Sequence, residues 1–179
     1  MPLKHKEAKL TNVNVVDGDI TKIKADALIT AINSGGLWFG GLDGAIQRSS
    51  GFMFHAQAQA AMPLTDGHIV FAPKRGPHNG KFEAVLFIVD DLHEPLYDLI
   101  TLALEAAVSH KFMSVNIPTI RTGVMAGVYE PRSKALSELA RAVNDFIEKN
   151  PNKLDDVNIV VYGNKDDRMF LLSVCSTTN

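Results

Sequence analysis

Cysteine is almost absent from this sequence, since Cys175 is the single one among 179 residues. One thiol excludes an internal disulfide and a zinc cluster built on cysteines. Such sparse usage is typical of a reducing compartment, so we expect a cytosolic, that is cytoplasmic, protein. The first residues, MPLKHKEAK, carry charge without the apolar core of a signal peptide, and no apolar segment approaches the ~20 residues of a membrane span.

The chain also has little excess charge of either sign. Its 18 basic residues oppose 20 acidic ones, and Lys and Arg never form a run longer than a pair. No basic stripe is therefore available for nucleic acid, and no charged face for an anionic membrane. A negatively charged ligand would have to be held by local groups.

Several catalytic and metal-binding motifs are missing as well. No Ser stands in a G-x-S-x-G turn, and the six His residues form neither HExxH nor a pair four positions apart, so we expect no metal and no cofactor. The segment DDLHE, residues 90–94, could gather carboxylates and an imidazole about a metal. A solvated strand end before a helix is the simpler interpretation. Cys175 lies among apolar residues and is expected to be a small buried side chain.

What the chain does contain is a regular alternation of strand-like and helix-like segments. With 46% apolar residues it can bury a core large enough for a sheet covered by helices. We therefore predict a single α/β domain over residues 1–179, a three-layer α/β/α sandwich on a mixed sheet. Strands are predicted at 13–19, 25–33, 67–73, 82–90, 112–118 and 157–163, and helices at 43–61 with a possible break at Gly51, 95–111, 132–150 and 166–175.

The segment NSGGLWFGGLDGAIQ, residues 33–47, places four glycines within seven positions. Glycine costs roughly 0.5–1 kcal/mol relative to Ala in regular structure, so this loop needs bare backbone. It has neither the Gly-Lys-Ser/Thr end of a P-loop nor the GxGxxG spacing of a dinucleotide fold. It does follow a strand and lead into a helix, where exposed N–H groups favour a phosphate or diphosphate. Four segments are expected to meet there, at the carboxyl ends of the strands: 18–21, 33–44, 121–127 and 162–164.

The stretch GDITKIKADALITAINSGGLWFGGLDGAIQRSSG resembles the macro domain family, whose signature runs GDIT, a strand ending VNAAN, a glycine-rich loop and VDGAI. Asn33 ends the strand, and Asp43 follows ten positions later, as in the mono-ADP-ribosyl hydrolase group of that family. Downstream, IPTIRTGVMAG looks like that group's second loop, FPCISTGVFG, and VVYGN falls where relatives place an aromatic beside adenine. The resemblance covers residues 13–164.

The resemblance implies a role for each matching residue. Asp19 would accept the adenine amino group with help from the backbone of Ile20, and Asn33 would contact the distal ribose. Asp43, together with Asn33, would be catalytic. The diphosphate and the rest of the ligand would be contacted by residues of the two loops and of the last strand end: Gly40, Gly41, Leu42, Arg121, Thr122, Gly123, Val124, Met125, Tyr162 and Asn164.

Simpler interpretations exist for the same side chains. Asp19 could end a strand in an Asx turn with Thr21, and Asn33 could be a turn residue. Asp43 could be only the N-cap of the following helix, a role that Asp fills well. Glycines could serve ordinary turns.

The chain also departs from the family pattern. Trp38 and Phe39 replace two further glycines of the hydrolytic relatives, and Gln47 stands where His is common. Met125 takes the place of an aromatic that covers the distal ribose. Arg121 replaces a small residue. Arg121 or Trp38 could contact a phosphate or leaving group, although a solvent-facing Arg and an aromatic packed on the core are the more ordinary explanations.

From the resemblance we expect an ADP-ribose-binding domain that hydrolyses a group from C1″ of the distal ribose: a protein-linked ester, a phosphate or a related ester. The substrate diphosphate and a loop-held water would suffice without a cofactor. One alternative is a module that binds ADP-ribose, free or attached to protein, without turnover. Another is an RNA-binding or structural protein that keeps only the fold. The sequence leaves the cleaved linkage and the oligomeric state open.

Overall fold

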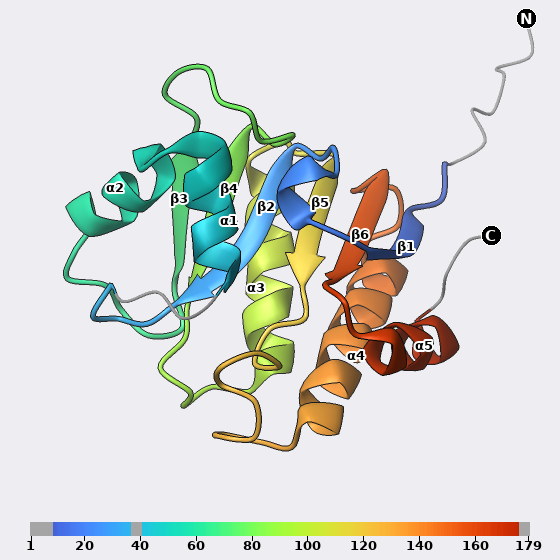
Figure 1. Ribbon diagram of the computed structural model, residues 1–179. Helices are drawn as coiled ribbons and strands as arrows, with labels where there is room; N and C mark the ends of the chain where they lie inside the picture. Colours follow the sequence, from blue (N-terminus) through green and yellow to red (C-terminus); the bar gives the residue numbers. More distant parts are fainter. Residues whose placement is uncertain (1–8, 37–40, 176–179) are drawn as a thin grey trace, which may run out of the picture.

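The computed structural model describes residues 9–36 and 41–175, and in these residues it contains one six-stranded sheet with the order β1-β6-β5-β2-β4-β3 (Figure 1). Only β3, at one edge, runs antiparallel to its neighbour. The sheet is therefore mixed, as predicted. The strands are β1 (Asn12–Asp17), β2 (Ala27–Ile32), β3 (Ile69–Pro73), β4 (Ala84–Val89), β5 (Ser114–Pro118) and β6 (Asp156–Val161).

Helices cover both faces of this sheet and complete the predicted three-layer sandwich (Figure 1). α1 (Gly41–Ser50), α2 (Met53–Ala60) and a short 3-10 helix, η1 (Ile20–Lys22), lie on one face. The other face is covered by α3 (Leu96–Ser109), α4 (Arg132–Lys149) and α5 (Lys165–Val174). The sequence pattern did not predict η1.

Two apolar clusters, one on each face, form the core. Side chains of a strand alternate between the faces. In β2, Leu28 and Ile32 therefore pack with α1 and α2, whereas Ile29 packs with α3 and α4. All six residues of β4 are buried, as expected for an inner strand covered on both sides. Cys175 packs in the cluster with α4 and α5, and burial raises the pKa of its thiol to about 11, so the prediction of a small buried side chain is confirmed.

The predicted helix at 43–61 is divided in two at Gly51. This residue has a φ of +62°, a left-handed conformation that glycine adopts readily, and its N–H donates to the carbonyl of Gln47 at 2.8 Å. α1 therefore ends at Ser50, and α2 starts in a new direction at Met53. The predicted break is confirmed.

The predicted hairpin of residues 67–90 is also present, since β3 pairs antiparallel with β4.

None of the helices in the described parts of the chain is long and apolar enough to cross a membrane.

Candidate active site

A cavity of about 480 Å³ lies at the carboxyl ends of β1, β6, β5 and β2. These strands are parallel, so the loops that follow them meet at one edge of the sheet. The volume of the cavity lies within the range of small-molecule sites. Each of the four segments that the sequence predicted to meet contributes to its lining.

Most of the residues that the sequence assigned to the ligand line this cavity: Asp19, Ile20, Gly41, Leu42, Asp43, Arg121, Thr122, Gly123, Val124, Met125, Tyr162 and Asn164. Asn33 does not. It lies half-buried directly after β2, where its carbonyl accepts a hydrogen bond from the N–H of Gly36 at 3.0 Å. Its contact with the distal ribose stays a prediction. Gly40, Trp38 and Phe39 lie outside the described residues.

Asp19 stands between β1 and η1. Its Oδ1 accepts hydrogen bonds from the backbone N–H of Thr21 at 2.9 Å and from the Thr21 hydroxyl at 2.7 Å. The predicted Asx-type turn is therefore present, and Asp19 also faces the cavity. Burial alone would raise the pKa of Asp19, but the bonds from Thr21 and the charges of Lys22 and Arg48 hold this pKa below its ordinary value. The carboxylate stays ionised and can only accept hydrogen bonds.

Tyr162 and Asn164 follow β6 at the rim of the cavity. The side chain of Tyr162 is 84% exposed, which leaves its ring free to stack on a planar ligand group. Asn164 caps α5, because its Oδ1 accepts the N–H of Asp167 at 3.0 Å. The two residues thus offer an open aromatic surface beside a fixed helix start.

Asp43 is buried in the first turn of α1 and lines the cavity. Its Oδ1 lies 3.1 Å from Nε2 of His55, a fully buried residue of α2. The interpretation of Asp43 as an N-cap is wrong, because α1 begins two residues earlier, at Gly41. No sequence signal identified His55, since its partner lies across the break between the two helices.

Arg121 anchors the second loop from inside the protein. Its guanidinium donates from Nε and Nη2 to the two carboxylate oxygens of Asp90, at 2.9 and 2.8 Å, and from Nη1 to Glu130 at 3.2 Å. Nη2 also donates to the carbonyl of Glu94 at 2.7 Å, and the group stacks over the ring of Tyr129. The interpretation as a solvent-facing residue is wrong, because only 6% of Arg121 is exposed.

The guanidinium of Arg121 keeps its positive charge in this buried environment. Burial alone would lower its pKa, but the hydrogen bonds and charges of Asp90 and Glu130 raise it above its ordinary value. Its backbone has a φ of +64°, an uncommon conformation for a residue with a side chain. The buried ion pairs hold the loop in this shape, and the same guanidinium is largely occupied by protein partners.

Arg132 holds the second loop from the other side and was not identified from the sequence. It is the first residue of α4 and donates from Nη1 to the carbonyl of Thr122 at 2.8 Å. Its Nε donates to Oδ1 of Asp167 at 3.1 Å, and its Nη2 pairs with Oδ2 of the same carboxylate. All three residues line the cavity. Arg132 therefore joins the second loop to the starts of α4 and α5.

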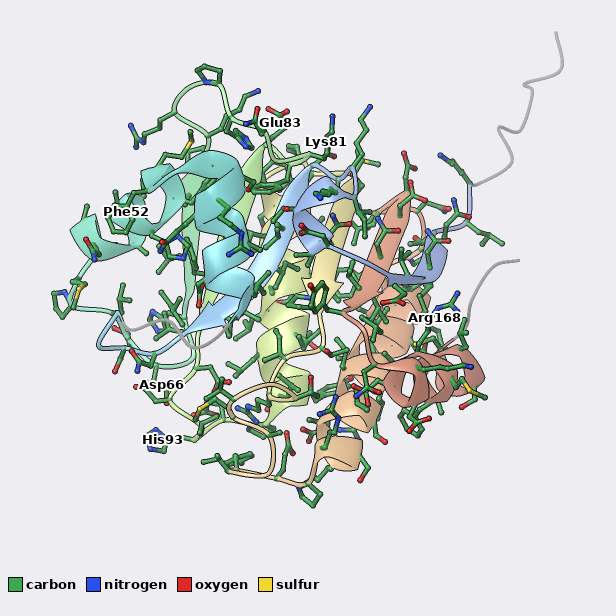
Figure 2. The ribbon with its side chains drawn as sticks, in the orientation of Figure 1. Phe52, Asp66, Lys81, Glu83, His93 and Arg168 are labelled. Atoms are coloured by element: carbon green, nitrogen blue, oxygen red, sulfur yellow. The ribbon has the colours of Figure 1, made fainter. Side chains whose placement is uncertain are left out.

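The DDLHE segment does bring acidic groups and an imidazole together. Asp66, Asp91 and His93 have ligand atoms within 4.8 Å of one another, and Figure 2 shows the first and last of these below α2. Their polar atoms bind the protein itself: Asp66 accepts from the N–H of Asp91 and pairs with His93, both at 2.9 Å. Asp91 accepts from the N–H of Ser34 at 2.8 Å. The group thus fixes the turn after β4 to the start of the glycine-rich loop. The absence of a metal stays a prediction.

Relatives with assigned names cover nearly the whole chain. It is 30% identical to the O-acetyl-ADP-ribose deacetylase of Cronobacter turicensis over 172 residues, which cover 89% of this chain and 92% of that protein. It is 27% identical to the ADP-ribose glycohydrolase MACROD1 of Mus musculus over 93% of this chain. In that second comparison the chain spans 53% of the relative's length. No family model matches the chain.

Solved structures share the fold. A Trypanosoma brucei macrodomain in complex with ADP-ribose superimposes with a TM-score of 0.78 at 22% identity, over 94% of this chain and 71% of that one. An Oceanobacillus iheyensis macrodomain superimposes with a TM-score of 0.75 at 22% identity, over 89% of this chain and 88% of that one. At this identity the similarity concerns the arrangement of the backbone.

Proposed function

Since this chain belongs to the macro domain family, we propose that it is a single domain that binds ADP-ribose and hydrolyses a group from the distal ribose. The group would leave C1″ as a protein carboxylate, a phosphate or the acid of a related ester. The names of the relatives, a deacetylase of O-acetyl-ADP-ribose and an ADP-ribose glycohydrolase, support this substrate class. We place the reaction in the cytosol, in agreement with the sparse use of cysteine.

One observation carries the proposal: a single cavity is lined by two carboxylates, Asp19 from the loop after β1 and Asp43 from the first turn of α1. Arg48 of α1 also lines the cavity, and its charge contributes to the lowered pKa of Asp19. This arrangement suits an elongated ligand with an amine at one end and a reacting group at the other.

The ligand's parts match the groups along the cavity. The ionised Asp19 can accept the adenine amino group, and the exposed ring of Tyr162 can stack on the base. Gly41 and Leu42 lie in the first turn of α1, where the helix dipole favours the negatively charged diphosphate. The segment Thr122–Val124 lines the same cavity on a loop that two arginines, Arg121 and Arg132, hold in place.

Asp43 serves as the base for an attacking water in this proposal. The water oxygen forms a bond to C1″ while the bond from C1″ to the leaving oxygen breaks, and its electron pair departs with the leaving group. The proton lost by the water moves to the Asp43 carboxylate. A positioned base of this kind accelerates a reaction by about 10²–10⁴-fold.

Calorimetry with ADP-ribose, ADP and AMP tests the binding half of the proposal. We expect ADP-ribose to bind most tightly, because it alone reaches from Asp19 to the Asp43 end. No binding of any of the three at sub-millimolar concentration would contradict the assignment. Release of product from mono-ADP-ribosylated protein, ADP-ribose 1″-phosphate or O-acetyl-ADP-ribose tests the hydrolytic half. Binding without turnover of any of them would identify a non-catalytic ADP-ribose-binding module, which the replaced glycines at Trp38 and Phe39 favour.

A further inference from the structure

The carboxylate of Asp43 has a buried imidazole as its neighbour. Nε2 of His55 lies 3.1 Å from Oδ1 of Asp43, and His55 is wholly inaccessible to solvent while Asp43 is 5% exposed. His55 comes from a different helix and is absent from the residues that line the cavity. The ring is therefore linked to the described lining of the cavity through the carboxylate of Asp43.

The ring of His55 is held by its surroundings. It packs edge-on against Phe87 of β4, with 5.3 Å between ring centroids, and lies parallel to the ring of Phe52 at 6.2 Å. Side chains fixed in this way by a packed core keep one orientation. An Nε2–H group at this position directs its hydrogen bond to one oxygen of Asp43.

We propose that His55 is a positioning residue for Asp43, an inference that rests on the proposed hydrolysis. The imidazole N–H holds Oδ1, so that Oδ2 is the oxygen that orients the water and receives its proton. The hydrogen bond to Oδ1 is kept after the proton arrives, because the protonated acid still offers a carbonyl oxygen there. This is the arrangement in which a base is itself oriented by a third group.

A purely structural role is the competing explanation. His55 belongs to the apolar layer between α2 and the sheet, and a carboxylate partner would satisfy a buried ring that has no part in the reaction. The two roles differ in what a substitution changes. A structural role affects stability, and through it all functions together, whereas a positioning role affects kcat and leaves ligand affinity in place.

The test compares His55→Phe, which keeps an aromatic ring without a donor, with His55→Gln, which retains an N–H group. We expect His55→Phe to lower kcat by about ten- to a hundredfold with the affinity for ADP-ribose within about twofold of wild type. His55→Gln is expected to recover kcat to within about threefold. His55→Leu serves in place of His55→Phe if that variant does not fold. When His55→Phe is added to Asp43→Asn, kcat should fall by no more than about twofold further.

His78→Gln is the matched control, because His78 bonds to Ser50 at 2.9 Å and packs on the same face of the sheet without touching Asp43. Its kcat should stay within about twofold of wild type. A folded His55→Phe with wild-type kcat overturns the positioning role and leaves the proposed hydrolysis intact. The same conclusion follows if kcat falls equally for His55→Phe and His55→Gln. It also follows if the losses of kcat in Asp43→Asn and in His55→Phe add in the variant that carries both substitutions. A wild-type protein that binds ADP-ribose and hydrolyses none of the substrates overturns both.

Discussion

Arg121 and Asp90 form a bidentate ion pair with donor–acceptor distances of 2.9 and 2.8 Å, and both residues are buried. Breaking such a pair leaves an unpaired charge inside the protein and typically costs about 3–5 kcal/mol. We expect Arg121→Met to lower the free energy of unfolding by about this amount, as measured by urea denaturation. The exposed Arg168 of α5 provides the control, and Arg168→Met should change stability by no more than about 0.5 kcal/mol. A loss in Arg121→Met as small as in the control would show that the pair is weakly coupled to folding.

Glu138 gives the stability a dependence on pH. Burial, followed by the hydrogen bond and charge of Glu130, raises the pKa of Glu138 above its ordinary value of 4.5, although Lys134 and Arg121 oppose this. The native protein therefore binds this proton more tightly than the unfolded chain does. Its contribution to stability is fully present below pH 4.5 and is lost as the pH rises through the folded pKa.

Glu138→Gln removes this titration. We expect the variant to gain melting temperature relative to wild type as the pH increases from 4.5 to neutrality, and to lose the advantage below that range. Melting curves of both proteins at closely spaced pH values measure the difference directly. A difference that is constant over the whole range would contradict the raised pKa of Glu138.

Asp19 is expected to serve every ligand that contains adenine. Asp19→Ala removes a hydrogen bond to a charged acceptor, for which about 1.5–3 kcal/mol is typical, so ADP-ribose, ADP and AMP should all bind more weakly by a similar factor. Asp19→Asn keeps an oxygen for the N–H of Thr21 and thereby preserves the turn. Calorimetry on both variants separates the ligand contact from the turn, and unchanged affinities in both would place adenine elsewhere.

Asp43→Asn separates catalysis from binding. The variant keeps the shape and an acceptor toward His55 but loses the base, so we expect hydrolysis to fall at least about tenfold. The affinity for ADP-ribose should be equal or higher, since a carboxylate repels the diphosphate. Turnover assays, calorimetry and a melting curve on the same preparation provide the three readouts. A variant as active as wild type would show that another group activates the water.

The strands and the longer helices could be predicted from the sequence, because each has its own local pattern of apolar, polar and glycine residues. The β-branched run of β1 and the apolar run of β2 predicted strands, and Gly51 marked the break between α1 and α2, although β1 is an edge strand with only two of its six residues buried. The three-residue helix η1 is too short to show a period, so it was missed. The start of this helix was predicted two residues too late, at Asp43 and not at Gly41, because Asp is favoured both at the N-cap and in the first turn.

The partners of the site residues were beyond local patterns. Arg121 pairs with Asp90, 31 positions away, and Arg132 with Asp167, 35 positions away. Each of these contacts depends on which strands are neighbours in the sheet, which a single sequence does not specify. Most of the residues that the sequence assigned to the ligand therefore line the cavity, whereas the burial of Arg121 in its ion pairs and the roles of Arg132 and His55 were not predicted.

The left-handed turn at Gly51, between α1 and α2, determines how close Asp43 and His55 lie to each other. In one continuous helix, Asp43 and His55 would stand about 18 Å apart along the axis. The change of direction between α1 and α2 instead brings their side chains to 3.1 Å (Figure 1). A Cβ at Gly51 would meet no atom within 4 Å, so a larger residue there would be resisted only by its own backbone torsion. The distance between the Asp43 carboxylate and the His55 imidazole thus depends on the backbone torsion of Gly51, which lies eight residues after Asp43 and four before His55.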